Sequence, residues 1–207
     1  MSINGDRRLM QIAREAVQDH GAIQEVTELA ALLIILRDRD VKNLMEIGSE
    51  AGGTFYAWCQ VTNPEGLKIS LDLPTGASGS WNYSTPEAWD KRTKLMQSFA
   101  KDVVCISGDS HTDDSLRAVN YVLKGELLDF LFIDGDHTFY GVKTDYEMYS
   151  PFVKPGGIIA FHDIKDSQFH RHRGCMVADF WKTLKGKFKA EIRTGQQDWG
   201  GIGVVFV

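Results

Sequence analysis

Two short apolar segments, separated by the length of one helix, constrain the fold of this chain more than any other feature. Residues 130–133 and 158–161 are rich in Ile, Leu and Phe, and each run ends abruptly at ionisable residues. Such runs are typical of strands covered on both faces, and the length between them suits a crossover between parallel strands. In open α/β sheets, ligands bind at the carboxyl ends of the strands. We therefore expect Asp134, Asp136, His137, His162 and Asp163 to gather at one rim.

The rest of the chain repeats this alternation. Strands are predicted at 42–47, 66–71 and 103–107, each followed by a turn and a helix, and an antiparallel hairpin is predicted at 188–193 and 202–207. Two helices, 6–18 and 23–38, precede the first strand. The pattern predicts an α/β fold with a doubly wound, mostly parallel, seven-stranded Rossmann-like sheet. We expect a single domain over 1–207, with 1–40 as a helical extension and 41–207 as the core.

Size and charge narrow the class of protein. The chain has 207 residues and a net charge of −5, so it offers no basic face for nucleic acid. No apolar run is long enough to span a bilayer. The three scattered cysteines lack metal-ligand spacing and indicate reduced thiols, so a cytoplasmic location is expected. The helix at 23–38 is so apolar that it must be buried against the sheet or against another subunit, which makes a homo-oligomer plausible.

A glycine-rich turn follows the first predicted strand, in the sequence Glu46-Ile-Gly48-Ser49-Glu50-Ala-Gly52-Gly53-Thr54. Glycines let the backbone approach a ligand closely, and the helix that follows offers free amide groups. Asp72 ends the next strand about 20 residues further on, the spacing of an acid that binds ribose hydroxyls. The turn therefore predicts a nucleotide-like cofactor.

The charges of the turn favour one kind of cofactor. Glu50 takes the place of the second glycine of the dinucleotide fingerprint, and there is no phosphate-binding Lys. Glu46 and Glu50 would repel a diphosphate, whereas they suit a cofactor that carries ammonium and sulfonium charges. S-adenosylmethionine therefore fits the turn better than NAD or ATP.

The motifs of this chain, taken together, resemble those of a known family. The turn at 46–54, Asp72, Gly108-Asp109-Ser110, Ile133-Asp134-Gly-Asp-His137 and Lys154-Pro-Gly-Gly-Ile-Ile-Ala-Phe-His162-Asp163 occur in the order seen in class I S-adenosylmethionine-dependent methyltransferases. Within them the chain is most similar to the bacterial group of CmcI-type cephalosporin-biosynthesis proteins and macrolide-sugar O-methyltransferases. The resemblance covers about 24–163 and implies O-methylation of a hydroxyl on a small molecule or sugar.

The resemblance also implies roles for individual residues. The methionine end of the cofactor would be lined by Glu46, Gly48, Ser49 and Gly52, with Gly53 and Thr54 completing the turn. Asp72 would bind the ribose hydroxyls, and Asp109 with Ser110 would border adenine. His137 would be the general base beside Asp134, because a histidine has a pKa near neutrality and suits proton removal from an alcohol.

Metal-dependent relatives bind Mg²⁺ through an acid matching Asp134 and a pair matching His162 and Asp163. Oxygen ligands suit Mg²⁺, but imidazole does not, and His162 stands where relatives have an acid or an amide. A softer ion such as Mn²⁺ is the alternative. His162 could instead hydrogen-bond the substrate or orient Asp163.

Other interpretations stay open at the level of sequence. An NAD-linked oxidoreductase and a non-catalytic cofactor-binding protein of the same fold are the alternatives to a methyltransferase. Several polar residues favour structural roles: Asp145 as part of an exposed helix face, and the run from His170 to Arg173 as a solvated loop. Asp113 or Asp114 is expected to cap a helix. Trp81 and Tyr83 could form a lid over the acceptor.

Overall fold

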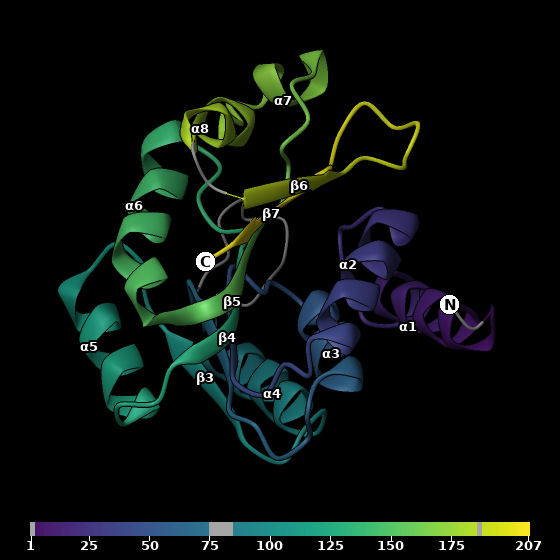
Figure 1. Ribbon diagram of the computed structural model, residues 1–207. Coiled ribbons are helices and arrows are strands. Elements are labelled where there is room, and N and C mark those ends of the chain that lie inside the picture. Colours follow the sequence, from purple (N-terminus) through teal and green to yellow (C-terminus); the bar gives the residue numbers. More distant parts are fainter. Residues whose placement is uncertain (1–2, 75–84, 186–187) are drawn as a thin grey trace.

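The computed structural model describes residues 3–74, 85–185 and 188–207, with side chains from residue 7 onward. Its centre is a seven-stranded sheet with the order β3-β2-β1-β4-β5-β7-β6 (Figure 1). The strands are β1 (Leu44–Ile47), β2 (Lys68–Asp72), β3 (Val103–Ser107), β4 (Leu128–Ile133), β5 (Val153–Phe161), β6 (Phe188–Ile192) and β7 (Ile202–Phe206). Strands β1 to β5 pair in parallel, and β7 is antiparallel to both β5 and β6. The predicted fold class is confirmed.

Helices cover both faces of the sheet, as a doubly wound fold requires (Figure 1). Buried apolar side chains of α1 (Ile3–Gln18), α2 (Val26–Asp38), α3 (Gly53–Val61) and α4 (Pro86–Gln97) form one core with one face. Those of α5 (Asp113–Leu123), α6 (Phe139–Tyr149) and α8 (Val177–Thr183) form a second core with the other. Two shorter helices, η1 (Ser150–Phe152) and α7 (Gln168–His172), lie in the connections before and after β5.

Local capping explains where the helices differ from the predicted bounds. Helix α2 begins three residues later than expected, because Glu25 is its N-cap and accepts a hydrogen bond from the amide of Glu28. Helix α5 is capped by Thr112, not by Asp113 or Asp114. A helix, α7, also forms within the predicted loop around His170. Trp81 and Tyr83 lie outside the described residues.

The apolar helix α2 packs against α1 and α3, and its buried side chains belong to the first core. Ile34 and Ile35 on the same helix are only partly buried. Within the described ranges no helix has both the length and the apolar character needed to cross a membrane.

One crossing of the backbone brings the turn after β1 against the end of β4. The two strands pair in parallel, with Ile47 beside Ile133, so the residues that follow them meet. Gly48 has a φ of 79° and lies so close to the carbonyl of Asp134 that a Cβ there would collide with that group. Only glycine satisfies both conditions.

We expect Gly48→Ala to lower the free energy of unfolding much more than Gly125→Ala. Both glycines have positive φ, so both variants carry a left-handed alanine costing about 1–2 kcal/mol. A Cβ on Gly125 meets nothing within 4 Å, whereas one on Gly48 overlaps backbone, which adds about 1–3 kcal/mol. Urea unfolding of the two variants measures the difference. Equal losses would contradict the close crossing.

Candidate active site

The glycine turn is held by one carboxylate from the neighbouring strand. Oδ2 of Asp72, at the end of β2, accepts hydrogen bonds from the backbone amides of Ser49 (3.1 Å) and Glu50 (2.6 Å). Nη2 of Arg92, on α4, donates to the same oxygen at 3.1 Å, and Nε of Arg92 donates to the carbonyl of Glu50. Burial raises the pKa of Asp72 even though Arg92 opposes this. Asp72, which was predicted to bind ribose hydroxyls, therefore also fixes the shape of the glycine turn.

Arg92 is a residue of this site that the sequence reasoning missed. Its side chain is buried. The residue precedes the predicted adenine loop in the sequence and lies in α4, whose other charged residues are exposed. No motif marks it. The one available signal was that two acids, Glu50 and Asp72, needed a cationic partner nearby.

Glu46 lies below the turn and is completely buried. Its Oε1 accepts a hydrogen bond from the indole Nε1 of Trp58 at 3.1 Å. Burial raises the pKa of Glu46 to about 8, and the negative charge of Asp134 adds to this. The side chain is therefore a neutral acid over much of the physiological range, and it supports the turn from inside the protein.

The predicted adenine loop follows β3. The amide of Gly108 donates to the carbonyl of Asp72 (2.9 Å), and Oδ1 of Asp109 accepts from the amide of His111 (2.9 Å). The carbonyl of Ser110 accepts from the hydroxyl of Tyr149 at 2.7 Å. The loop is thus anchored both to β2 and to α6.

Asp145 was predicted to be exposed, and this is wrong. Its side chain is completely buried, with Oδ1 3.3 Å from Nε2 of His111. The carboxylate raises the pKa of His111 above its ordinary value through a hydrogen bond. Helix α6 instead turns Asp145 toward the 108–112 loop.

The ends of β4 and β5 bring together two carboxylates and two imidazoles of the five residues predicted there, whereas Asp136 accepts a hydrogen bond from the amide of Thr138 at 2.8 Å. Asp134 Oδ1 lies 3.0 Å from Nε2 of His137 and 3.3 Å from Nδ1 of His162. Asp163 Oδ1 lies 3.3 Å from the same His162 nitrogen, and its Oδ2 lies 3.4 Å from Nδ1 of His137. Asp163 has a φ of 62°, a left-handed conformation that few non-glycine residues adopt. We refer to Asp134, His137, His162 and Asp163 as the rim.

The rim stabilises its own charges. Burial would lower the pKa of His162, but the adjacent Asp134 and Asp163 outweigh this and raise it to about 9. Burial likewise opposes ionisation of Asp163, and the surrounding histidines nevertheless lower its pKa well below its ordinary value. The pKa of Asp134 is lowered for the same reason. Two carboxylates with imidazolium between them form a compensated cluster in a buried place.

His170 joins this cluster, although it was predicted to lie in a solvated loop, which is wrong. It is 3% exposed, and its Nε2 lies 3.1 Å from Asp163 Oδ1. Its Nδ1 lies 2.7 Å from the carbonyl of Lys165, an arrangement that fixes the ring. The short helix α7 turns His170 inward, while Arg171, His172 and Arg173 stay exposed as predicted.

The segment before and within α2 also reaches the rim. The amide Nε2 of Gln24 donates to Asp134 Oδ2 at 3.0 Å. Four residues further on, the buried carboxylate of Glu28 accepts from the backbone amides of Gly195 (3.3 Å) and Gly201 (2.7 Å) and lies 3.3 Å from Nζ of Lys165. The N-terminal extension therefore connects the rim to the β6–β7 connection.

The donors at the rim do not suit Mg²⁺. Mg²⁺ favours six oxygen ligands in octahedral geometry. Here the carboxylate oxygens of Asp134 and Asp163 already face imidazole nitrogens at 3.0–3.4 Å. The predicted ligands Asp134, His162 and Asp163 do lie together, but as a mixed nitrogen and oxygen set.

Comparison with known proteins gives the family. Residues 45–164 match the model of a methyltransferase domain family. The chain belongs to this family. An uncharacterised protein of Acanthamoeba polyphaga mimivirus is 29% identical over 129 residues, and one of Sinorhizobium fredii is 22% identical over 151. This methyltransferase-domain chain spans 54% of the length of the first relative and 15% of the second.

Solved structures with the same fold are similar over nearly the whole chain. The O-methyltransferase TomG from Streptomyces achromogenes, in complex with S-adenosylmethionine, has a TM-score of 0.67 at 17% identity and covers 96% of this chain and 89% of its own. An O-methyltransferase from Bacillus cereus in complex with S-adenosylhomocysteine has a TM-score of 0.65 at 17% identity, and the match covers 100% of this chain and 92% of that one. The N-methyltransferase NodS from Bradyrhizobium japonicum has a TM-score of 0.60 at 14% identity, and the match covers 96% of this chain and 97% of that one. At these identities the likeness describes the fold.

Glu46 should make the free energy of unfolding depend on pH. Its pKa is about 8 in the folded protein and near 4.5 in the unfolded chain, so the folded state binds more protons between these values. Stability therefore falls as pH rises from 4.5 to 8, by a few kcal/mol in order of magnitude, and levels off above that. Glu46→Gln should remove this decline. The measurement is urea unfolding at pH 5, 6.5 and 8, with parallel curves for the two proteins as the contradicting result.

Proposed function

We propose that the protein transfers the methyl group of S-adenosylmethionine to a hydroxyl oxygen of a small-molecule or sugar acceptor. The observation that carries this proposal is the contact between the glycine turn and the rim, where Gly48 lies against the carbonyl of Asp134. A cofactor held at the turn would have its reactive end beside His137 and Asp134. Methyl transfer is an in-line substitution, so the main task of the protein is to hold two reactants side by side.

The cofactor would extend along the carboxyl ends of β1, β2 and β3. The backbone of Gly48, Ser49, Gly52, Gly53 and Thr54 would surround the methionine part, with Glu46 beneath it. Asp72 would accept hydrogen bonds from the ribose hydroxyls, using lone pairs that its bonds to the turn leave available. Asp109 and Ser110, in the loop anchored by Tyr149, would border adenine.

His137 is the group best placed to remove the proton of the acceptor. Its Nε2 faces Asp134 at 3.0 Å, so this carboxylate orients the ring, and Nδ1, which lies 3.4 Å from Oδ2 of Asp163, is the nitrogen that would act as base. As the acceptor oxygen attacks, the oxygen–carbon bond forms and the carbon–sulfur bond breaks. The proton goes to His137, and the neutral thioether S-adenosylhomocysteine leaves.

Oxygen is favoured over nitrogen as the acceptor atom because of the base. The same fold occurs in an N-methyltransferase, so the fold itself does not select the atom. An alcohol must lose a proton to become a good nucleophile, whereas a neutral amine already has a free lone pair. A rim with two carboxylates and several imidazoles suits the acceptor that needs proton removal.

Charge, free thiols and a partly buried helix face support three further parts of the proposal: the kind of acceptor, the location and the oligomeric state. A net charge of −5 favours a small acceptor over nucleic acid. The three free thiols favour a cytoplasmic location. The partly buried Ile34 and Ile35 on α2 favour a homo-oligomer, which light scattering after size exclusion would test.

The proposed function is tested by calorimetry with S-adenosylmethionine and S-adenosylhomocysteine, followed by detection of S-adenosylhomocysteine with a panel of catechols and sugars. We expect binding of both cofactor forms and turnover with a hydroxylated acceptor. No binding at millimolar cofactor would overturn the proposal, and enhanced fluorescence of bound NADH would support an oxidoreductase instead.

His137→Ala should lower kcat by about 10²–10⁴-fold while the Kd for S-adenosylmethionine changes less than about twofold. The reason is that the base acts on the acceptor and not on the cofactor. His172→Ala is the matched control, since His172 is exposed on the neighbouring α7, and it should keep the wild-type kcat. An unchanged kcat in His137→Ala would remove this residue from the mechanism.

Asp72→Asn should weaken cofactor binding by about 10–100-fold, because a charged acceptor for the ribose hydroxyls is lost. It should also lower the melting temperature, since the same carboxylate holds Ser49, Glu50 and Arg92. Asp102→Asn, at an exposed position before β3, is the control. Calorimetry and thermal unfolding measure the two effects, and unaltered affinity would rule out the ribose contact.

A further inference from the structure

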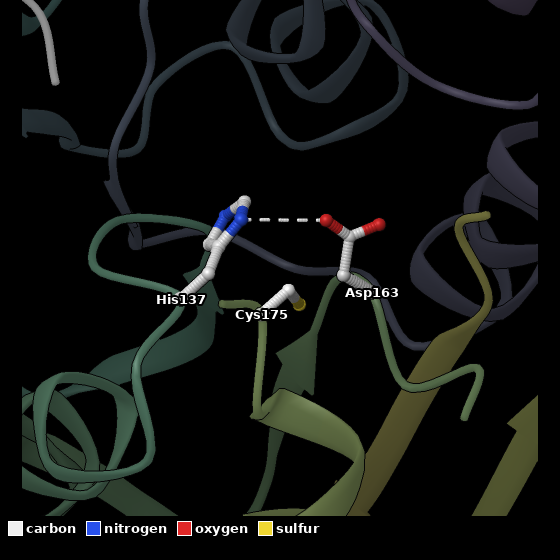
Figure 2. Close-up of side chains that lie close together, drawn as sticks. All are labelled: His137, Asp163 and Cys175. Atoms are coloured by element: carbon white, nitrogen blue, oxygen red, sulfur yellow. Dashed lines mark ion pairs between the residues drawn. The ribbon is translucent and has the colours of Figure 1, made fainter. Parts of the chain in front are cut away.

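We propose that this protein binds one transition-metal ion of the zinc or cobalt class through His137, Asp163 and Cys175. The three side chains come from different connections and converge at the rim (Figure 2). Their donor atoms, an imidazole nitrogen, a carboxylate oxygen and the thiol sulfur, all lie within 4.8 Å of one another. Sequence reasoning had assigned Cys175 no role.

Backbone hydrogen bonds hold the three donors in place without an ion. The amide of Met176 donates to the carbonyl of His137 at 2.7 Å, which brings the adjacent Cys175 beside that histidine. The amide of Cys175 donates to the carbonyl of His170 at 3.0 Å, at the end of α7. The amide of His162, the residue before Asp163, donates to the carbonyl of Ile133 at 3.2 Å. The site is therefore built into the backbone.

Three neighbouring groups, Asp134, His162 and His170, act as outer partners that orient a donor. Asp134 faces Nε2 of His137 at 3.0 Å, which leaves Nδ1 directed to Asp163, the pair marked in Figure 2. A carboxylate behind a histidine is the usual outer partner of a metal-bound imidazole. His162 and His170 both lie beside Oδ1 of Asp163, at 3.3 and 3.1 Å, so Oδ2 is the oxygen left for a ligand.

Two buried polar atoms beside the proposed ligands lack hydrogen-bond partners among the described residues. Asp163 is 8% exposed, and within the described residues its Oδ1 has no hydrogen-bond partner of good geometry, although two imidazoles are near. Nε2 of His162, which is 4% exposed, is also without such a partner there. Buried polar atoms in this state are uncommon and call for an explanation.

The donor types decide the class of ion. Thiolate and imidazole ligands favour zinc and its neighbours in the transition series, whereas Mg²⁺ favours oxygen alone. Three protein ligands leave a fourth tetrahedral position open, as in zinc sites that exchange a ligand. Redox use of Cys175 is disfavoured, because burial raises the pKa of its thiol to about 12 and keeps it protonated when no cation is bound.

Loading of this site and methyl transfer should exclude each other. This part rests on the proposed function, in which Nδ1 of His137 takes the proton of the acceptor. An ion bound to Nδ1 occupies the lone pair that the base uses. The His137→Ala variant tests the base by itself, so a failure of the base and a failure of the metal site are distinguishable.

The metal site is tested by titrating the purified, chelator-treated full chain with Co²⁺ and recording its absorption spectrum. We expect one equivalent to produce a thiolate-to-cobalt charge-transfer band, displaced by Zn²⁺ and not by Mg²⁺. Cys175→Ser should lose this band and bind Zn²⁺ at least about tenfold more weakly. Cys105→Ser, a partly buried cysteine on β3, is the matched control and should keep the band.

Absence of the band in the wild type, or its persistence in Cys175→Ser, would overturn the proposal. If Cys175→Ser does not fold, X-ray absorption at the zinc edge of the wild type decides instead, and a shell without sulfur is the overturning result. Zn²⁺-loaded wild type should also transfer no methyl group, and turnover at the unloaded rate would overturn the assignment of Nδ1 as a ligand.

Discussion

The close passage of the turn after β1 over the end of β4 is the constraint on which the rest of the site depends. Parallel pairing of these two central strands sets Ile47 beside Ile133, and the next residue of the first strand, Gly48, has no room for a side chain. The turn after β1 therefore lies against the backbone that follows β4. The proposed cofactor-binding half of the site and the proposed reactive half are joined by backbone geometry.

Charge compensation is the second determinant. On the cofactor side, Arg92 balances Asp72 and Glu46 stays neutral through burial. On the reactive side, Asp134 and Asp163 are balanced by imidazoles. Isolated buried carboxylates would be costly, so each acid needs a nearby cation or a proton. One half compensates its buried acids with a guanidinium and a bound proton, and the other compensates them with imidazoles.

The sequence predicted the sheet and the gathering of Asp134, His137, His162 and Asp163 because apolar runs and strand ends are visible in one dimension. It could not predict Arg92 or His170. Both lie in polar helices, where no period distinguishes a residue that turns inward from one that faces solvent. Asp145 failed for the same reason, since its burial depends on the loop that α6 packs against.

The contacts of Gln24 and Glu28 have a consequence for where the working unit of this protein begins. The family match starts at residue 45, yet a fragment cut there would leave Asp134 Oδ2 without its amide donor and the amides of Gly195 and Gly201 without their buried acceptor. The boundary of the family match and the boundary of the stabilising contacts are therefore different. A chimera made from two relatives of this chain should therefore take α2 and the β6–β7 connection from the same parent, because Glu28 on α2 binds the amides of that connection.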